Sequence, residues 1–206
     1  MFATLRSKGI GLRRTDMETK NILIVGVGGQ GTLLASKLLG KMLLTKGYDV
    51  KVSEVHGMSQ RGGSVTTYVR YGDKVYSPVI EEGEADFVLS FELLEAARNA
   101  KYVKKNGGIL LTNTQEINPM PVITGAAEYP ADLEKKLAAT GIKLDAFNAL
   151  ELAEQAGSSK AVNIVLLGRL SKYFDFTLEE WEQAIEESVN EKFVEMNKKA
   201  FMLGRK

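Results

Sequence analysis

Three glycines between an apolar run and an amphipathic helix pattern constrain the fold of this chain most strongly. Residues 22–25, which follow Asn21, are all apolar. They are followed by Gly26-x-Gly28-x-x-Gly31 and then by leucines and a methionine that recur every four residues. This order of strand, tight turn and helix is typical of the first unit of a doubly wound α/β fold. The helix pattern ends near Gly47, and a second strand at residues 50–55 completes a βαβ unit with two parallel strands.

The next segment departs from a repeated βαβ pattern. Only eight residues, 56–63, separate the second strand from an alternating run at residues 64–71. Because a parallel connection needs roughly a dozen residues or more, we expect this third strand to run antiparallel to a neighbour. Gly72-Asp73 then has the composition of a two-residue hairpin turn, which predicts a further strand at residues 74–76.

The rest of the chain alternates between strand and helix patterns and ends in a wholly helical part. Strands are expected at residues 87–90, 109–111, 122–123 and 142–146. Helices are expected at residues 92–103, 132–139, 148–155 and 161–170, after the capping box Thr177-x-x-Glu180, and around residues 193–201. This order predicts a three-layer α/β/α domain with a mixed sheet, Rossmann-like only at its first βαβ unit. We expect residues 17–206 to form that single domain after a flexible basic leader, residues 1–16.

The composition excludes several kinds of site. The 206 residues include no cysteine, so this chain cannot supply the thiolates of an iron–sulfur cluster, a disulfide or a thiol nucleophile. The single histidine cannot form a multi-histidine zinc site, and we assign no metal. A formal net charge of +1 gives no basic field for nucleic acid or an anionic membrane. No stretch has the length and apolarity of a membrane-spanning helix, and we expect a cytoplasmic protein.

The glycine turn is the first candidate site. Backbone amides at a helix start can hold a pyrophosphate where glycines let it approach closely. The expected phosphate- or cofactor-contacting residues are Gly26, Gly28, Gly29, Gln30 and Gly31. Glu54 lies 23 residues after Gly31, near the spacing of an acid that binds ribose. The missing second crossover argues against a complete dinucleotide fold, and close helix–strand packing explains the glycines equally well.

The loop after the second strand is the second candidate site. It lies just beyond the C-terminal end of a parallel strand, where open α/β sheets place their ligands. Arg61 could bind a carboxylate or phosphate through two hydrogen bonds, and His56 could titrate near neutrality. A histidine among glycines is also common as an ordinary turn residue. The residues of this candidate site are Glu54, His56, Gly57, Met58, Ser59, Gln60, Arg61, Gly62 and Gly63.

Together, these two segments resemble a known family. Residues 24–31, Ile-Val-Gly-Val-Gly-Gly-Gln-Gly, and residues 53–65, Ser-Glu-Val-His-Gly-Met-Ser-Gln-Arg-Gly-Gly-Ser-Val, closely resemble the gamma domain of the 2-oxoacid:ferredoxin oxidoreductases. Among these, the small beta subunits of the indolepyruvate enzymes are most similar. Further matches lie at residues 76–78, 83–86, 163–168 and 197–201. The glycine motif alone is common, but its combination with the loop is specific.

The resemblance implies that this chain is one subunit of a larger enzyme. The implied reaction is the oxidative decarboxylation of an aryl pyruvate with coenzyme A to an aryl-acetyl-CoA, with electrons passed to ferredoxin. Thiamine diphosphate, magnesium and iron–sulfur clusters would reside on a large alpha subunit, because this chain has no cysteine and no Gly-Asp-Gly motif for the diphosphate. We therefore expect no cofactor to bind to this chain alone and no catalytic residue in it alone.

The implied partners are the large alpha subunit directly and ferredoxin indirectly. The loop from His56 to Gly63 would face the active site of the large subunit, and the glycine turn would contact a phosphate of coenzyme A. Two alternatives stay open at this point. One is the gamma subunit of a pyruvate or 2-oxoglutarate:ferredoxin oxidoreductase. The other is a stand-alone NAD- or FAD-binding protein of Rossmann type.

Overall fold

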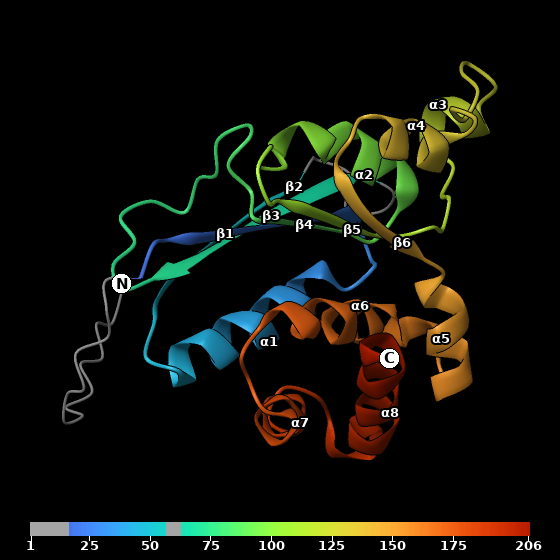
Figure 1. Ribbon diagram of the computed structural model, residues 1–206. Coiled ribbons are helices and arrows are strands. Elements are labelled where there is room, and N and C mark those ends of the chain that lie inside the picture. The colour runs from blue at the N-terminus through green and yellow to red at the C-terminus, as the bar shows by residue number, and fades with distance from the viewer. Residues whose placement is uncertain (1–16, 57–62) are drawn as a thin grey trace.

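A six-stranded sheet with helices on both faces forms the body of the protein (Figure 1). The computed structural model describes residues 17–56 and 63–206. The strands lie in the order β2-β3-β1-β4-β5-β6. Their bounds are β1 (Lys20–Val27), β2 (Asp49–His56), β3 (Ser64–Gly72), β4 (Phe87–Ser90), β5 (Ile109–Asn113) and β6 (Lys143–Phe147).

The sheet is mixed because β3 runs antiparallel to both of its neighbours. Tyr71 of β3 pairs with Lys20 of β1 on one side and with Val50 of β2 on the other. The pairings of β1 with β4, β4 with β5 and β5 with β6 are all parallel. The prediction of an antiparallel third strand is confirmed. Since β3 lies between β1 and β2, the two strands of the first βαβ unit are parallel without being neighbours.

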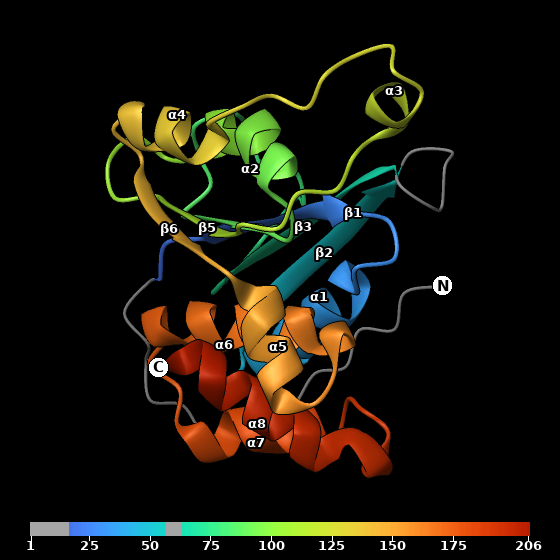
Figure 2. The same ribbon diagram turned by 90° about the vertical axis from the view of Figure 1, so that its right-hand side faces the viewer.

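Helices cover both faces of the sheet, which confirms the three-layer prediction. Figure 2 shows α2 and α4 on one side of the sheet and α1 with α5–α8 on the other. The short helix α3 stands out from the body, on the other side of α2 from α4 in Figure 2. The bounds are α1 (Thr32–Thr45), α2 (Leu93–Asn99), α3 (Met120–Ile123), α4 (Leu133–Ala139), α5 (Ala149–Ala156), α6 (Val162–Leu170), α7 (Leu178–Glu186) and α8 (Val194–Arg205). Single 3₁₀ turns are η1 (Ala100–Tyr102), η2 (Ser159–Ala161), η3 (Ser171–Tyr173) and η4 (Glu191–Phe193).

Strand β1 contributes to a separate apolar core on each face. Ile22 and Ile24 pack among the residues of α1, α6 and α8, whereas Leu23 and Val25 pack among those of α2 and α4. Successive side chains of a strand point to opposite faces, so a strand buried on both sides is apolar at every position. The continuous run Ile-Leu-Ile-Val at residues 22–25 therefore follows from the central place of β1.

Helices α6 and α8 pack backbone to backbone. A Cβ added to Gly168 of α6 would lie 2.1 Å from the carbonyl oxygen of Phe201, and one added to Gly204 would lie 2.0 Å from that of Val165. Neither position can therefore carry a side chain without separating the helices. The buried Trp181 of α7 lies against Phe201, with ring centroids 5.4 Å apart. The two glycines thus allow α6 and α8 to approach closely.

Two predicted strands are wrong. Residues 74–76 form no strand, because β1 and β2 already occupy both edges of β3 and leave no edge for a hairpin partner. The segment is held by side chains instead, with the Val75 N–H donating to Asp49 Oδ2 at 2.8 Å. Residues 122–123 belong to α3, where Pro119 is the N-cap. Pro121 lies in the first turn, where the fixed φ of proline suits a helix and its missing N–H costs no helical hydrogen bond, which explains this difference.

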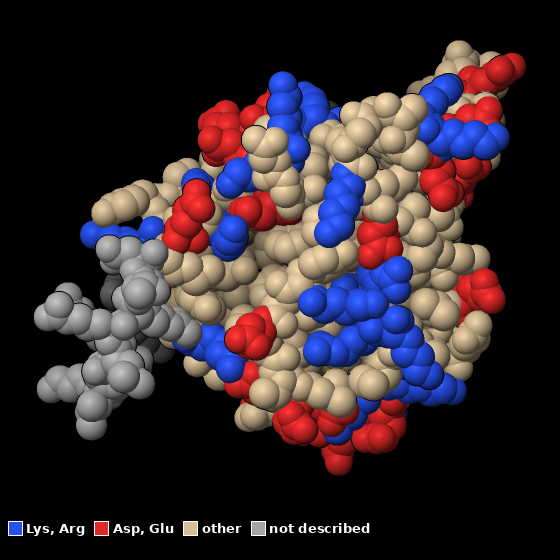
Figure 3. All heavy atoms as spheres, viewed as in Figure 1, with Lys and Arg blue, Asp and Glu red and all other residues tan. Residues whose placement is uncertain are grey.

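Two further expectations differ in extent or fall outside the description. The helix predicted at residues 92–103 is shorter, since α2 ends at Asn99 and continues only as the 3₁₀ turn η1. The predicted leader, residues 1–16, lies outside the described residues. Among the residues that are described, no helix is long and apolar enough to cross a membrane. Figure 3 shows acidic and basic side chains interspersed on one face, with basic ones gathered around the end of α8.

Candidate functional site

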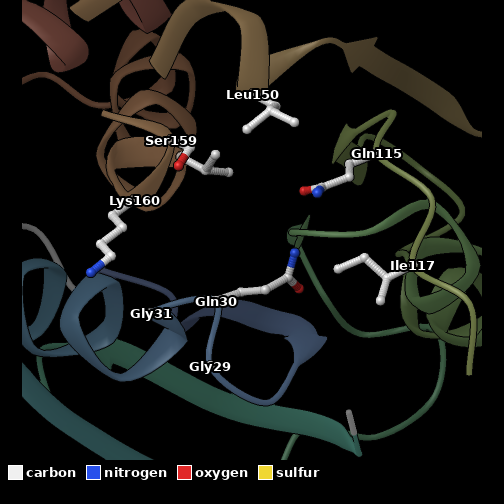
Figure 4. Close-up of a pocket in the computed structure, with 9 residues that line it drawn as sticks. Gly29, Gln30, Gly31, Gln115, Ile117, Leu150, Ser159 and Lys160 are labelled. Atoms are coloured by element: carbon white, nitrogen blue, oxygen red, sulfur yellow. The ribbon is translucent and has the colours of Figure 1, made fainter. Parts of the chain in front are cut away.

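A cavity of about 540 Å³ opens beside the glycine turn, at the C-terminal edge of the parallel strands (Figure 4). Open α/β sheets place their ligands at this edge. The walls come from the β1–α1 turn, the segment after β5, the start of α5, the turn η2 and the start of α6. The lining residues are Gly29, Gln30, Gly31, Gln115, Ile117, Leu150, Ser159, Lys160 and Val162.

The glycines of the turn are needed for two different reasons. Gly29 and Gly31 have φ angles of 95° and 84°, a conformation that favours glycine. Gly26 has no room for a side chain, because an added Cβ would lie 2.9 Å from the Cβ of Phe91. Gln30 braces the turn, since its Oε1 accepts from the Val27 N–H at 2.8 Å and its Nε2 donates to the Phe91 carbonyl at 3.0 Å. Packing therefore accounts for Gly26 and Gln30.

The start of α1 presents unpaired backbone donors to this cavity. Gly31 is the N-cap, no side chain caps the helix, and its first turn holds no acidic residue. The first N–H groups of a helix have no partner within it and carry the positive end of the helix dipole. Lys160 extends from η2 toward α1 (Figure 4) and makes no ion pair with any residue that the structure describes. This wall of the cavity is electropositive and suits an anionic group.

The structure brings the glycine turn and the end of the candidate loop into contact. The Gly28 N–H donates to the Gly63 carbonyl at 2.9 Å. The next residue, Ser64, donates from its hydroxyl to Oε2 of the buried Glu95 at 2.6 Å. The loop residues Gly57, Met58, Ser59, Gln60, Arg61 and Gly62 lie outside the described residues, as does the side chain of His56. Their roles stay predictions.

Glu54 does not occupy the position of a ribose-binding acid. In dinucleotide-binding folds the second strand lies next to the first, which places its terminal acid beside the glycine turn. Here β3 lies between β1 and β2. The Thr67 hydroxyl of β3 donates to Glu54 Oε2 at 3.3 Å. The ribose interpretation of Glu54 is therefore inconsistent with the strand order.

Sequence reasoning missed Glu92, which holds one wall of the cavity. Glu92 is the N-cap of α2 and is 1% exposed. Its Oε2 accepts from the Glu95 N–H at 2.8 Å, and its Oε1 accepts from the Ile117 N–H at 3.0 Å and the Tyr129 hydroxyl at 2.6 Å. Burial and the hydrogen bond to Glu92 raise the pKa of Tyr129 above its usual value. The three-residue spacing of Glu92 and Glu95 after a strand was the available sequence signal.

Asn163 lies behind the turn and supports it. It is 4% exposed, and its Nδ2 donates to the Gly31 carbonyl at 3.4 Å. Its Oδ1 accepts from the Ile164 N–H at 2.9 Å. In the part of the chain that the structure describes, no three His, Cys, Asp or Glu side chains gather as metal ligands. The described part of the site is thus a set of backbone donors, amides and one lysine around an open cavity.

Comparison with known proteins gives one consistent result. The family model for pyruvate ferredoxin/flavodoxin oxidoreductase matches residues 21–206. The chain is 48% identical to the indolepyruvate oxidoreductase subunit IorB of Thermococcus kodakarensis over 195 residues, which covers 92% of this chain and 96% of that protein. It is 28% identical to the pyruvate/ketoisovalerate oxidoreductases common subunit gamma of the same organism, over 85% of this chain and 89% of that one.

A solved structure shares the fold. The 2-oxoglutarate:ferredoxin oxidoreductase of Magnetococcus marinus, solved with 2-oxoglutarate, coenzyme A and succinyl-CoA, superposes with a TM-score of 0.68 at 18% identity. The match covers 93% of this chain and 31% of that one, so the fold described here forms about a third of the longer polypeptide. With a family model over residues 21–206 and a nearly full-length relative at 48% identity, the chain belongs to the pyruvate ferredoxin/flavodoxin oxidoreductase family.

Proposed function

We propose that this chain is the small subunit of an indolepyruvate:ferredoxin oxidoreductase. The observation that carries the proposal is the difference between two relatives from one organism. Identity is 48% to the indolepyruvate subunit of Thermococcus kodakarensis and 28% to the gamma subunit that serves pyruvate and ketoisovalerate. The complete enzyme would convert an aryl pyruvate and coenzyme A into an aryl-acetyl-CoA and carbon dioxide, and pass two electrons to ferredoxin. The same difference favours this enzyme over a pyruvate enzyme, and the 18% identity to the Magnetococcus marinus protein favours it over a 2-oxoglutarate enzyme.

The redox cofactors of that reaction do not fit this chain. No cysteine is present to ligate a cluster. The described residues contain no cluster of acidic or histidine ligands for the magnesium of thiamine diphosphate. When bound on the large alpha subunit, thiamine diphosphate and the clusters would supply the decarboxylation and electron-transfer chemistry. This chain would then be inactive alone, a cytoplasmic subunit that works only against its large partner and reaches ferredoxin through it.

The contribution of this chain would be to bind coenzyme A beside the active centre of the partner. One wall of the cavity is lined by the uncapped start of α1, the left-handed turn at Gly29 and Gly31, and Lys160, which makes no ion pair with the described residues. These groups suit the phosphates of coenzyme A. The loop from His56 to Gly63 leaves the same edge of the sheet and would face the thiamine site, with Arg61 near the carboxylate of the substrate. Residues 17–206 would act as one domain in this role.

The proposal is tested by purifying the chain together with its large subunit and measuring the reduction of ferredoxin or a dye. We expect coenzyme-A-dependent turnover of indolepyruvate and phenylpyruvate that exceeds turnover of pyruvate, and none from either chain alone. A preference for pyruvate would contradict the assignment to the indolepyruvate enzyme. Turnover by the isolated small chain would contradict its role as an accessory subunit.

The contact with coenzyme A is tested by Lys160→Ala in the reconstituted complex. Loss of a charge-assisted hydrogen bond of roughly 1.5 to 3 kcal/mol predicts an increase of about 10- to 100-fold in KM for coenzyme A with little change in kcat. Lys105→Ala, at an exposed lysine that lines none of the cavities described here, is the matched control. If the two variants had the same KM, the phosphates would not bind at this wall.

A further inference from the structure

The segment at residues 118–128, here called the α3 knob, projects from the body beside the cavity. It forms the middle of the connection from β5 to α4, residues 114–132. Connections of this length are uncommon between neighbouring elements and often carry function. The α3 knob contains no buried residue. Figures 1 and 2 show α3 standing out from the body at the edge of the sheet where the parallel strands end.

The base of the α3 knob is fixed by one buried carboxylate. Glu92 Oε1 accepts from the Ile117 N–H at 3.0 Å and from the Tyr129 hydroxyl at 2.6 Å. The residues that precede and follow the knob are therefore held at the same point, the N-cap of α2. Compact surface loops whose ends are held together in this way are frequently functional.

The α3 knob holds its shape through its own backbone. The Pro119 carbonyl accepts from the Ile123 N–H at 3.1 Å. The Pro121 carbonyl accepts from the N–H groups of Ala126 and Ala127 at 2.8 and 3.0 Å. Each proline also fixes a backbone angle. A segment that is ordered before it meets a partner loses little conformational entropy on binding.

The surface of the α3 knob has the composition of an interface. Met120 and Ile123 are 61% and 64% exposed and lie three residues apart on α3, so their side chains are neighbours. Glu128 is the only charged residue within residues 118–128, whereas 26% of the whole chain is charged. The centres of protein interfaces are likewise depleted of charge, and methionine is enriched there. Such a surface suits an apolar groove on another protein.

We propose that the α3 knob docks into an apolar groove on the large alpha subunit. The knob continues from a wall of the cavity, because Gln115 and Ile117 line the cavity just before it begins (Figure 4). Coenzyme A held in the cavity reaches the thiamine centre only if the large subunit lies across the cavity mouth. A partner in that position meets the α3 knob. This inference rests on the proposed function, since it takes the large subunit as the partner.

The alternative occupant is a second copy of this chain. Two copies that met through their α3 knobs would bring the same edge of both sheets together, because a symmetric contact uses the same surface of each copy. A second small chain, which has no cysteine to ligate a cluster, would then lie where the large subunit is needed. We therefore prefer the large subunit.

The absence of cysteine allows a direct test of burial. Ile123→Cys introduces a single thiol into the α3 knob. The matched control, Leu44→Cys, introduces one in the last turn of α1, far along the helix from the cavity, where Leu44 is 59% exposed. The measurement is the rate of maleimide labelling of the small chain, alone and in complex with the large subunit. We expect labelling at position 123 to slow at least tenfold in the complex and labelling at position 44 to stay the same. An unchanged rate at position 123 would overturn the proposal.

Truncation measures what the two exposed side chains contribute to assembly. Met120→Ala and Ile123→Ala should leave the melting temperature of the small chain nearly unchanged, because neither side chain is buried. We expect each variant to raise the dissociation constant for the large subunit about tenfold or more, and Leu44→Ala to leave it unchanged. Wild-type affinity in both knob variants would contradict docking at this surface.

Kinetics and oligomeric state separate this inference from the proposed function. Turnover lost in the knob variants should return as the concentration of small chain is raised, with KM for coenzyme A as in the wild type. A raised KM in variants that assemble normally would mean that the knob contacts the ligand instead. A dimer of the isolated chain that both truncations dissociate would assign the knob to a second copy. If the complex prefers pyruvate but its assembly still depends on Met120 and Ile123, the docking surface stands and the substrate assignment is wrong.

Discussion

Glycines serve opposite purposes in two regions of this protein, the α6–α8 contact and the β1–α1 turn. In α6 and α8, Gly168 and Gly204 have negative φ angles, which any residue can adopt. A Cβ added to either glycine would lie about 2 Å from a carbonyl oxygen of the other helix. In the turn, Gly29 has a positive φ angle of 95°, and an added Cβ would meet no atom within 4 Å. The first region needs glycine for space and the second for backbone conformation.

The comparison shows how to interpret a glycine motif. The pattern at residues 26–31 contains both kinds of glycine. A side chain at Gly26 would have no room, whereas one at Gly29 would have room but would be strained by the positive φ angle. A glycine that is explained by packing gives no information about a ligand. Gly29 and Gly31 both line the cavity, but a Cβ added to Gly31 would lie 2.7 Å from Asn163 Nδ2, so packing also explains that glycine. Within this motif, the case for a phosphate therefore rests on the open backbone at Gly29, together with Lys160.

The largest expected effect is that of Gly168→Ala. The new methyl group would overlap the Phe201 carbonyl and force α6 and α8 apart, with a loss of about 3 kcal/mol or more in the free energy of unfolding. Urea denaturation measures this. The control is Gly40→Ala in α1, where the added Cβ would lie 3.6 Å from Val52 Cγ2. Alanine has the higher helix propensity, so we expect this control to be neutral or slightly stabilising. Equal losses in the two variants would show that the close approach is not the cause.

Glu92→Ala should have the next largest effect, and it acts on the cavity wall. The substitution leaves the buried Glu95 N–H and the partly buried donors of Ile117 and Tyr129 without their acceptor, which should reduce the free energy of unfolding by about 2 to 4 kcal/mol. Thermal denaturation measures the change. Glu92→Gln keeps one oxygen as an acceptor and should lose clearly less. An alanine variant as stable as the wild type would mean that these hydrogen bonds add no net stability.

Gly29→Ala sharpens the comparison most directly. Because the added Cβ meets open space, only the left-handed conformation is penalised, by about 1 to 2 kcal/mol of stability. Since the substitution changes the wall that we assign to phosphate, KM for coenzyme A should rise while kcat of the reconstituted complex stays close to that of the wild type. If the variant folds and assembles but its KM for coenzyme A is unchanged, Gly29 serves only the conformation of the turn and does not contact the ligand.

The smallest effect is expected at Asp49, which belongs to neither region. The hydrogen bond from Lys51, followed by that from the Val75 N–H, lowers the pKa of Asp49 below its usual value. A carboxylate with a lowered pKa in the folded state stabilises the fold above its unfolded pKa of about 3.9 and loses that contribution as the pH falls through the folded pKa. Asp49→Asn should therefore lower the melting temperature slightly at pH 7 and leave it unchanged near pH 2. If Asp49→Asn still had a lower melting temperature than the wild type near pH 2, the lowered pKa of Asp49 would not be the cause.

Much of the fold could be predicted because its signals are local. The apolar run before the glycine turn, the capping box at Thr177 and Glu180, and the short connection before β3 each indicated an element or a direction that is present. The strand predicted at residues 74–76 is absent because other strands already pair with the edge that it needed. A hairpin strand at residues 74–76 needed a free edge of β3, and β1 and β2 had taken both. Local turn chemistry carries no information about which edges of a sheet are already paired.

The site was predictable in part for the same reason. Its glycine turn follows from a motif, whereas its other walls come from segments far apart in the chain, at Gln115, Leu150 and Lys160. No sequence spacing relates Lys160 to Gly31, and none places the Ile117 amide on the carboxylate of Glu92. These contacts exist only because the parallel strands end at one edge and deliver their following loops to the same place.

The sequence by itself determined the family, the mixed α/β architecture and the exclusion of a cysteine-ligated iron–sulfur cluster from this chain. Residue identity suffices for these, since a chain without cysteine cannot hold an iron–sulfur cluster whatever its fold. The tertiary structure alone decided that β3 separates β1 from β2, and that Lys160 lines the same cavity as the glycine turn. It also placed Glu54 on a strand that does not neighbour β1. These are relations between distant segments, and they depend on which strands and helices pack together.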